Sequence, residues 1–253
     1  MKSQLEFIKL AKQKVKHEFE KFDVYLVQCV RTLDELDDSR SSMYNKLKEL
    51  VKLNFPELDV SDERMAELYS KFGAREDFEK VELPKGIDIN NSFGANFNEG
   101  NKQLATNIAK ACLALEELRT KLIKFIDKEA ETRLKNLSTL LDPSLAARMV
   151  TEAGGLERLA LMPASTIQVM GAEKALFKHL RTGSRPPKHG IIFQVPMVHN
   201  APLNERGKVA RTLAAKISIC AKADYFTGHF IADKIVEELK RSLAHGKTKE
   251  RTE

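Results

Sequence analysis

Residues 5–36 read LEFIKLAKQKVKHEFEKFDVYLVQCVRTLDEL, and their apolar side chains recur every three and four positions. This spacing defines two columns, Leu5-Lys12-Phe19-Leu26-Leu33 and Ile8-Val15-Phe22-Cys29-Leu36. Nine of these ten positions are apolar or Cys. A repeat of about 3.5 residues is typical of a helix that packs along a supercoiled seam. The stretch therefore predicts a long helix that belongs to a coiled coil.

A second helical seam is predicted between residues 101 and 141. Its apolar positions share the same spacing: Leu104, Ile108, Ala111, Leu115, Leu118, Leu122 and Phe125, after which the stripe drifts to Ile126, Leu134 and Leu137. Neither predicted helix contains Pro or Gly, which are the residues least compatible with a helix interior. Two such seams joined by a folded segment predict an antiparallel coiled coil.

The segment between the seams, about residues 40–100, is expected to form a helical tip. Residues 41–53 predict a separate amphipathic helix, and Ser61 can cap another that runs to Gly73. An irregular crossing follows, indicated by four Asn between residues 90 and 98 and by four helix-breaking residues: Pro84, Gly86, Gly94 and Gly100.

The remainder of the chain predicts a globular helical domain over residues 139–246. Asp142-Pro143 can begin its first helix and Gly154-Gly155 can end it. Residues 191–195 (IIFQV) are expected to be extended, and residues 247–253 to form a polar tail. The other predicted helices cover residues 163–183 (interrupted at Gly171), 204–222 and 228–244. The expected fold is thus all-α: a coiled-coil domain over residues 1–138 with a helical tip, then the globular domain.

Composition and motifs exclude several classes of protein. The 253-residue chain has no apolar run of about 18 residues and no apolar signal core, so we expect a protein of the cytoplasm that spans no membrane. Its cysteines, Cys29, Cys112 and Cys220, are odd in number and far apart, which predicts free buried thiols. No HExxH, GxSxG, GxGxxG or GxxxxGK[ST] motif is present, and the six His residues form no ligand pairs. We therefore expect no enzyme activity, no metal site and no cofactor.

Positive charge is concentrated in the second half of the sequence. Residues 1–130 hold 22 Lys and Arg against 24 Asp and Glu, whereas residues 131–253 hold 20 against 12. Between residues 174 and 222, ten cations stand against one acid, Glu205. A field of this kind attracts polyanions, above all nucleic acid, although a basic run can also be a merely solvated face.

The expected contact residues follow from this charge. Gly171, Ala172, Glu173 and Lys174 lie at a predicted helix start, where free backbone N–H groups favour a phosphate. Lys174, Lys178 and Arg181 share a helical face because they are four and three residues apart. We further assign to the nucleic-acid surface the loop residues Arg185, Lys188 and His189, and the cations of the later helix, Arg206, Lys208, Arg211 and Lys222.

The same region resembles a known family. The stretch PASTIQVMGAEKALFKHLRTGSRPPKHGIIFQV (residues 163–195) is similar to the signature of Nop domains, and RGKVARTLAAKISICAKADYF (206–226) resembles the family's next helix. Upstream, LKELVKLNFPEL (47–58) is similar to the segment that interrupts the family's coiled coil. The resemblance covers nearly the whole chain, is strongest from residue 140 to 230, and is closer to archaeal members than to others.

This resemblance implies a scaffold of box C/D small ribonucleoproteins. Nop domains bind a kink-turn guide RNA jointly with a small kink-turn-binding protein, and their coiled coils pair two copies through the tip. The assembly directs ribose 2′-O-methylation, in which the methyl transfer belongs to fibrillarin. Full-length members begin with an α/β domain that holds fibrillarin, whereas this chain begins in the coiled coil, so we do not expect it to recruit fibrillarin itself. The resemblance also implies a nucleolar location if the source is eukaryotic.

Three other interpretations remain open at this point. A spliceosomal-type Nop protein would bind a small nuclear RNA kink-turn; its stacking His would correspond here to Lys188, with His189 beside it. A coiled-coil adaptor would bind other proteins and show no RNA binding at physiological salt. An RNA-modifying enzyme would need a cofactor motif that the sequence lacks.

Overall fold

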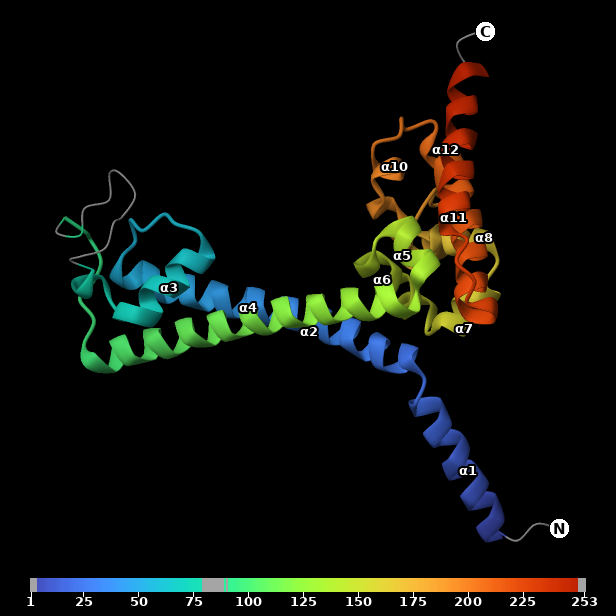
Figure 1. Cartoon of the computed structure of the whole chain (residues 1–253). Helices are drawn as coiled ribbons and strands as arrows, with labels where there is room; N and C mark the ends of the chain where they lie inside the picture. The colour runs from blue at the N-terminus through green and yellow to red at the C-terminus, as the bar shows by residue number, and fades with distance from the viewer. Residues whose placement is uncertain (1–3, 79–88, 90, 250–253) are drawn as a thin grey trace. The chain divides into compact units, whose positions relative to one another are not determined.

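The computed structural model describes residues 4–78, 89 and 91–249, and every regular element within these ranges is helical (Figure 1). The all-α prediction is therefore confirmed. Contacts divide the chain into two compact units. Unit 1 comprises Met1–Arg31 and Lys124–Glu253, and unit 2 comprises Thr32–Ile123. Of the predicted crossing, residues 84 and 86 lie outside the described ranges, as do residues 250–253 of the predicted tail.

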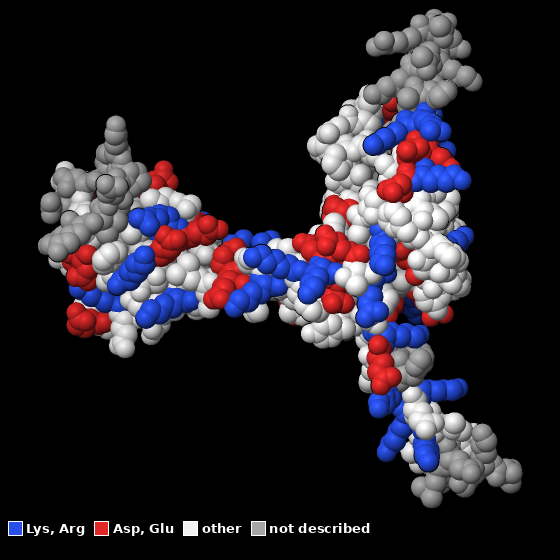
Figure 2. Space-filling model, in the orientation of Figure 1, with Lys and Arg blue, Asp and Glu red and all other residues white. Residues whose placement is uncertain are grey.

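Helices α2 (Phe22–Asn54) and α4 (Glu99–Arg133) form the predicted antiparallel pair. In unit 2, the Arg40 guanidinium donates to Glu116 at 2.9 Å, and Arg119 pairs with Asp37. In unit 1, the edge of one ring of the pair Tyr25–Phe125 meets the face of the other, with centroids 5.7 Å apart. Partner numbers fall on α4 as they rise on α2, which defines an antiparallel arrangement. Figure 2 shows acidic and basic side chains interspersed along these helices.

The first predicted seam is two helices rather than one. Helix α1 (Gln4–Phe19) is separated from α2 by two residues, Glu20 and Lys21. Its seam residues Ile8, Val15 and Phe19 are 47%, 50% and 72% exposed. In contrast, Leu26 and Leu33 on α2 are buried. A heptad pattern specifies an apolar face but not the helix that covers it, and for this reason the sequence did not reveal the break.

Two further helix predictions are corrected in unit 2. Residues 41–53 are the last turns of α2 and not a separate helix, because no Gly or Pro interrupts residues 22–54. On the part of α4 that lies in unit 2, the fully buried positions are Ala105, Ala109 and Cys112, whereas Leu104 and Leu118 of the predicted column are each 51% exposed. These small residues pack against the large side chains that fill this core. Among those side chains are Tyr44 and Leu47 on α2, Tyr69 on the helix that follows, and Phe55 and Phe78 just beyond helix ends.

The tip of unit 2 is closed by helix α3 (Asp62–Phe72) and the short η1 (Arg75–Asp77). As predicted, Ser61 caps α3 by accepting a hydrogen bond from the Arg64 N–H at 3.3 Å. Gly73 ends the helix with φ of 78°, a left-handed conformation that Gly adopts without strain.

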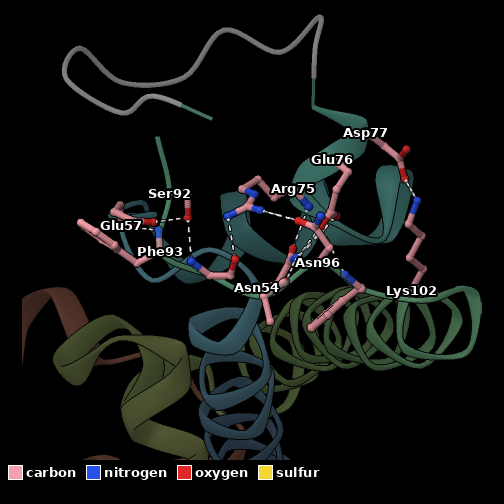
Figure 3. Close-up of polar contacts among 12 residues, drawn as sticks. Asn54, Glu57, Arg75, Glu76, Asp77, Ser92, Phe93, Asn96 and Lys102 are labelled. Carbon is pink, nitrogen blue, oxygen red and sulfur yellow. Dashed lines mark hydrogen bonds and ion pairs between the residues drawn. The ribbon is translucent and has the colours of Figure 1, made fainter. Parts of the chain in front are cut away.

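A buried polar network fixes the chain that crosses the tip (Figure 3). The fully buried Asn54 accepts hydrogen bonds from the Tyr69 hydroxyl (2.9 Å) and the Arg75 N–H (2.7 Å), and donates to the Ala95 carbonyl (2.9 Å). The Arg75 side chain donates to the Gly94 carbonyl at 3.2 Å. Because buried polar groups are costly when unpaired, these bonds hold residues 94 and 95 against the end of α2.

A carboxylate fixes the exposed side of the same crossing. Glu57 accepts hydrogen bonds from the Ser92 hydroxyl (2.6 Å) and the Phe93 N–H (2.8 Å). These bonds lower the pKa of Glu57 below its ordinary value. The backbone of Phe93 is thereby held in place, yet its side chain is 93% exposed and points away from the network in Figure 3.

Unit 1 is built around helix α11 (Arg206–Lys222), which packs against α5, α7, α8 and α12. The surrounding helices are α5 (Lys135–Leu141), α6 (Pro143–Ala153), α7 (Leu156–Leu161), α8 (Ala164–Val169), α9 (Glu173–Thr182), η2 (Ile191–Gln194), α10 (Pro196–His199), the π-helical η3 (Ala223–Thr227) and α12 (Ala232–Lys249). The start of α6 at Asp142-Pro143 and its end at Gly154 are as predicted. All three cysteines are free and buried, also as predicted.

The extended conformation predicted for residues 191–195 is wrong. Residues Ile191–Gln194 form the 3₁₀ helix η2, in which the Phe193 N–H donates to the Gly190 carbonyl at 3.0 Å. β-Branched and aromatic residues favour strands only where a partner strand accepts their backbone bonds. Here α8 and its C-terminal end accept the bonds of Gly190 and Ile191 instead. Helix α12 also extends to Lys249, beyond the predicted end at residue 244.

Candidate nucleic-acid interface

The first part of the candidate surface is helix α9, which buries none of its side chains. Lys174, Lys178 and Arg181 are exposed and share one face, as their spacing predicted. The apolar residues Phe177 and Leu180 lie on the same helix and are 68% and 71% exposed. Together with Thr182, these five residues line one surface hollow. Cations and apolar groups are therefore presented side by side.

The N-terminus of α9 differs from the prediction of free N–H groups. Gly171 precedes the helix with φ of 79°, and its N–H donates to the Glu173 carboxylate at 2.8 Å. This carboxylate is an anion at the helix N-terminus, where the macrodipole favours negative charge. The Glu173 carboxylate thus accepts the hydrogen bond that the Gly171 N–H could otherwise donate to a phosphate.

The second part of the surface is the loop Ser184–Gly190, which is fixed to the preceding helices. The Gln168 amide donates to the Lys188 carbonyl at 2.7 Å, and the Gly190 N–H donates to the Gln168 carbonyl at 2.9 Å. A Cβ at Gly190 would lie only 1.9 Å from the Met170 carbonyl oxygen, so this approach requires Gly. The loop cations are consequently presented on a defined backbone.

An aromatic and cationic cluster joins this loop to α11. The His189 ring stacks on Phe193 with centroids 4.5 Å apart and planes 11° from parallel. The Arg206 guanidinium lies over the Phe193 ring at 5.4 Å, and donates to the carbonyls of Ala201 (2.9 Å) and His199 (3.0 Å). Arg206 therefore orders the loop before α11, in addition to carrying charge at the surface.

Lys188 is also partly engaged within the chain. Its ammonium donates to the Leu203 carbonyl at 3.2 Å, and its methylene groups pack about Gly207. Contacts thus join two separate groups of assigned residues: Gly171 with Glu173, and His189 with Arg206 through Phe193, with the charge of Lys188 close to them. Ala172 lies between the first two as the N-cap of α9.

The remaining assigned cations are spread more widely. Arg185 is exposed in the loop, and Lys208 and Arg211 are exposed one turn apart on α11. Lys222, also exposed, lies at the other end of α11, about 21 Å from Lys208 along the helix axis. Lys216, another cation of the basic stretch, forms a 2.7 Å ion pair with Glu238.

Sequence reasoning missed the aromatic and apolar members of this surface. Phe193 lay in the segment predicted to be extended, and no pattern marked it as a stacking partner of His189. Phe177 and Leu180 are three residues apart on an amphipathic helix, a pattern that predicts a buried face. Only the structure shows that this face is open.

Burial lowers the pKa of His189 below its ordinary value, and the charges of Arg206 and Lys188 lower it further. The unfolded chain takes up this proton near the ordinary His pKa of about 6.5, before the folded protein does. Stability should therefore decrease as the pH falls from 7.5 to 5.5, and this decrease should be smaller in the His189→Gln variant. Thermal unfolding at both pH values measures the difference. An equal loss of stability in the wild type and in His189→Gln would contradict the assignment.

The two units differ in charge. Unit 1 contains 29 Lys and Arg against 18 Asp and Glu, whereas unit 2 contains 13 against 18. Unit 1, with its excess of positive charge, is therefore the unit that attracts a polyanion over long range. Among the described residues, no helix has the length and apolarity needed to cross a bilayer. Within the same ranges, no group of three or more His, Cys, Asp or Glu is arranged to hold a metal ion.

Comparison with known proteins gives consistent matches. The model of the Nop family, whose description is "snoRNA binding domain, fibrillarin", matches residues 32–245. An uncharacterized NOP5 family protein of Methanocaldococcus jannaschii is 38% identical, with 92% of this chain and 59% of that protein covered. Nucleolar protein 58 of Emericella nidulans is 32% identical, with 92% and 42% covered. The chain thus spans less than two thirds of the length of either relative.

A solved structure agrees with these sequence matches. It is the crystal structure of a fibrillarin/Nop5p complex, which the chain matches with a TM-score of 0.59 at 28% sequence identity. The match covers 93% of this chain and 73% of the solved chain.

Proposed function

The chain belongs to the Nop family, and from this we propose that it is a non-catalytic, RNA-binding scaffold of a box C/D-type small ribonucleoprotein. The observation that carries the proposal is helix α9, which presents Lys174, Lys178 and Arg181 to solvent together with Phe177 and Leu180. A helix with no buried side chain contributes little to the core. The residues at its exposed positions are therefore not determined by packing and can be suited to binding a partner. The excess of positive charge in unit 1 supports a nucleic-acid partner.

The finer proposal is that the RNA carries a kink-turn and is bound together with a kink-turn-binding protein. The cations of α9, of the loop and of α11 would contact phosphates, as Lys and Arg do in most nucleic-acid interfaces. Phe177 and Leu180 would contact the protein partner, because exposed aromatic and aliphatic residues are typical anchors of protein interfaces. A surface that needs both partners explains why the two chemistries alternate on one helix. Fibrillarin would supply the methyl transfer, and we assign no residue of this chain to that reaction.

We further propose that two copies associate through the tip of the coiled-coil domain (residues 1–138), while residues 139–246 bind the ribonucleoprotein. Phe93 supports this assignment because its backbone is fixed by Glu57 while its side chain is 93% exposed. Leu53 is 63% exposed, and its carbonyl accepts a hydrogen bond from the Ala95 N–H at 2.8 Å, which places it beside the same crossing. Ordered apolar groups lose little conformational entropy on binding, so they are suited to anchor an interface.

A gel-shift titration tests the proposed function. A box C/D kink-turn RNA is titrated with the chain, with and without the kink-turn-binding protein, at two salt concentrations. A supershift that requires the small protein is expected, and it should weaken steeply with salt. If about six phosphates are neutralised, log K should change with log[salt] with a slope of about −4 to −5. No supershift at either salt concentration would reject the scaffold and favour a coiled-coil adaptor; methylation by this chain alone with S-adenosylmethionine would favour an enzyme.

A further inference from the structure

Helix α1 presents an apolar face that no described residue of the chain covers. All its described side chains, from Phe7 to Lys16 and at Phe19, are exposed. One side forms a groove lined mainly by apolar atoms, with Ile8, Ala11, Val15 and Phe19 along it and with Lys12, Lys16 and Glu20 at its border. Lys16 and Glu20 form an exposed ion pair of 3.8 Å, so the border keeps a net positive charge through Lys12. An isolated helix of 16 residues is only marginally stable in water. Packing of a partner against this apolar face would therefore stabilise the helix.

The sequence of α1 specifies the geometry of that partner. Its groove continues the heptad register of α2, with Ile8, Val15 and Phe19 at seam positions, which indicates pairing with a second helix. Lys12 occupies a seam position as well, and Lys9 and Lys16 flank the seam on one side. Figure 2 shows several basic side chains in the lower part of the view, where Figure 1 labels α1. A polar residue in a seam selects register and partner, because it is stable only opposite a group that neutralises it.

We propose that α1 is a docking helix for an acidic amphipathic helix of another protein, with which it forms a two-stranded coiled coil. The partner would place apolar residues in the groove, an acidic residue opposite Lys12, and acids opposite Lys9 and Lys16. A second copy of this chain does not fit. In a parallel pair the two Lys12 side chains would face each other, and in an antiparallel pair Lys9 and Lys16 of both copies would flank the same side.

A designed peptide tests this proposal on the full chain. The probe has three heptads with Leu at the seam positions, Glu at the flanking positions and one Glu placed opposite Lys12. A second probe has Lys in place of every Glu. Fluorescence anisotropy of the labelled peptides should show the acidic probe binding at least tenfold more tightly, with an affinity that falls as salt is added.

Two variants of equal charge distinguish the groove from general electrostatics. Val15→Asp puts a carboxylate into the seam and should abolish binding of the acidic probe. Gln13→Asp adds the same charge on the opposite side of α1, and its affinity should stay within about twofold of the wild type. Circular dichroism of both variants checks that their helix content is the same.

Several outcomes would overturn the proposal. Equal binding of the two peptides, no binding of either, or equal loss in both variants would show that the groove does not select an acidic helix. Self-association of the wild-type chain that Val15→Asp removes would identify a second copy as the occupant. Binding to vesicles containing anionic lipid that Val15→Asp removes would assign α1 to a membrane surface instead. None of these outcomes bears on the RNA surface of unit 1, so the proposed scaffold function is tested separately.

Discussion

Replacing Lys174 and Lys178 together by Glu is expected to weaken binding to the complex of kink-turn RNA and its protein by roughly 100-fold. Each substitution removes a phosphate contact and introduces a like charge, and the two effects together are worth about 1.4 kcal/mol, or tenfold in affinity, at each position. The salt dependence should become shallower by about 1.4 to 1.8 in slope, because each phosphate contact releases less than one counterion. Gel-shift titrations at three or more salt concentrations measure both quantities.

A matched variant separates this local effect from net charge. Lys234 and Lys240 are exposed on α12 in the same unit, so replacing both by Glu changes the charge equally without touching α9. That variant should lose less than about fivefold in affinity and keep most of the wild-type salt slope. Because α9 buries no side chain, thermal unfolding of the α9 variant should match the wild type. Equal losses in the two variants would mean that only overall charge matters, and a lowered melting temperature would assign the lysines to the fold.

Local chemistry explains why much of the helical fold could be predicted. Ser61 and Gly73 bound α3 through a side-chain cap and a left-handed residue, both properties of single residues and their immediate neighbours. Asp142-Pro143 and Gly154 bound α6 in the same way. The spacing that put Lys174, Lys178 and Arg181 on one face depends only on the period of the helix. None of these predictions required knowledge of which elements are neighbours.

The predictions that were wrong, or incomplete, all depend on tertiary neighbours. Residues 191–195 have the composition of a strand, but the Ile191 N–H donates to the Met170 carbonyl at the end of α8, and the N–H groups of Phe193 and Val195 donate to carbonyls three residues earlier. Residues 5–19 continue the heptad pattern of α2, yet the described side chains of this stretch, at residues 7–16 and 19, are all exposed. At the candidate site, Arg206 was recognised as a cation, whereas its bonds to the carbonyls of Ala201 and His199 depend on how the loop folds. The charge of a residue and the helical period can be determined from the sequence, but the tertiary contacts of each side chain cannot.

Replacing Phe93 by Asp is expected to raise the dissociation constant of the proposed dimer by about 30-fold or more. Truncation of a central aromatic anchor typically costs at least 2 kcal/mol, and a buried carboxylate adds a desolvation penalty. Sedimentation velocity over a range of protein concentrations gives the dissociation constants of wild type and variant. Since Phe93 is 93% exposed in the single chain, the substitution should leave the unfolding transition of the monomer unchanged.

The control for this experiment lies on α4, outside the tip. Leu118 is 51% exposed on the apolar stripe of that helix, and Leu118→Asp introduces the same charge at a comparably open apolar site. If the tip is the interface, Leu118→Asp should keep the wild-type dissociation constant within about threefold. Dissociation by Leu118→Asp with no effect of Phe93→Asp would move the interface to the stripe of α4, and a wild-type chain that stays monomeric would reject dimerisation by this chain. Because Glu57 fixes only the backbone at residue 93, a loss confined to Phe93→Asp would show that the network in Figure 3 presents the ring for binding.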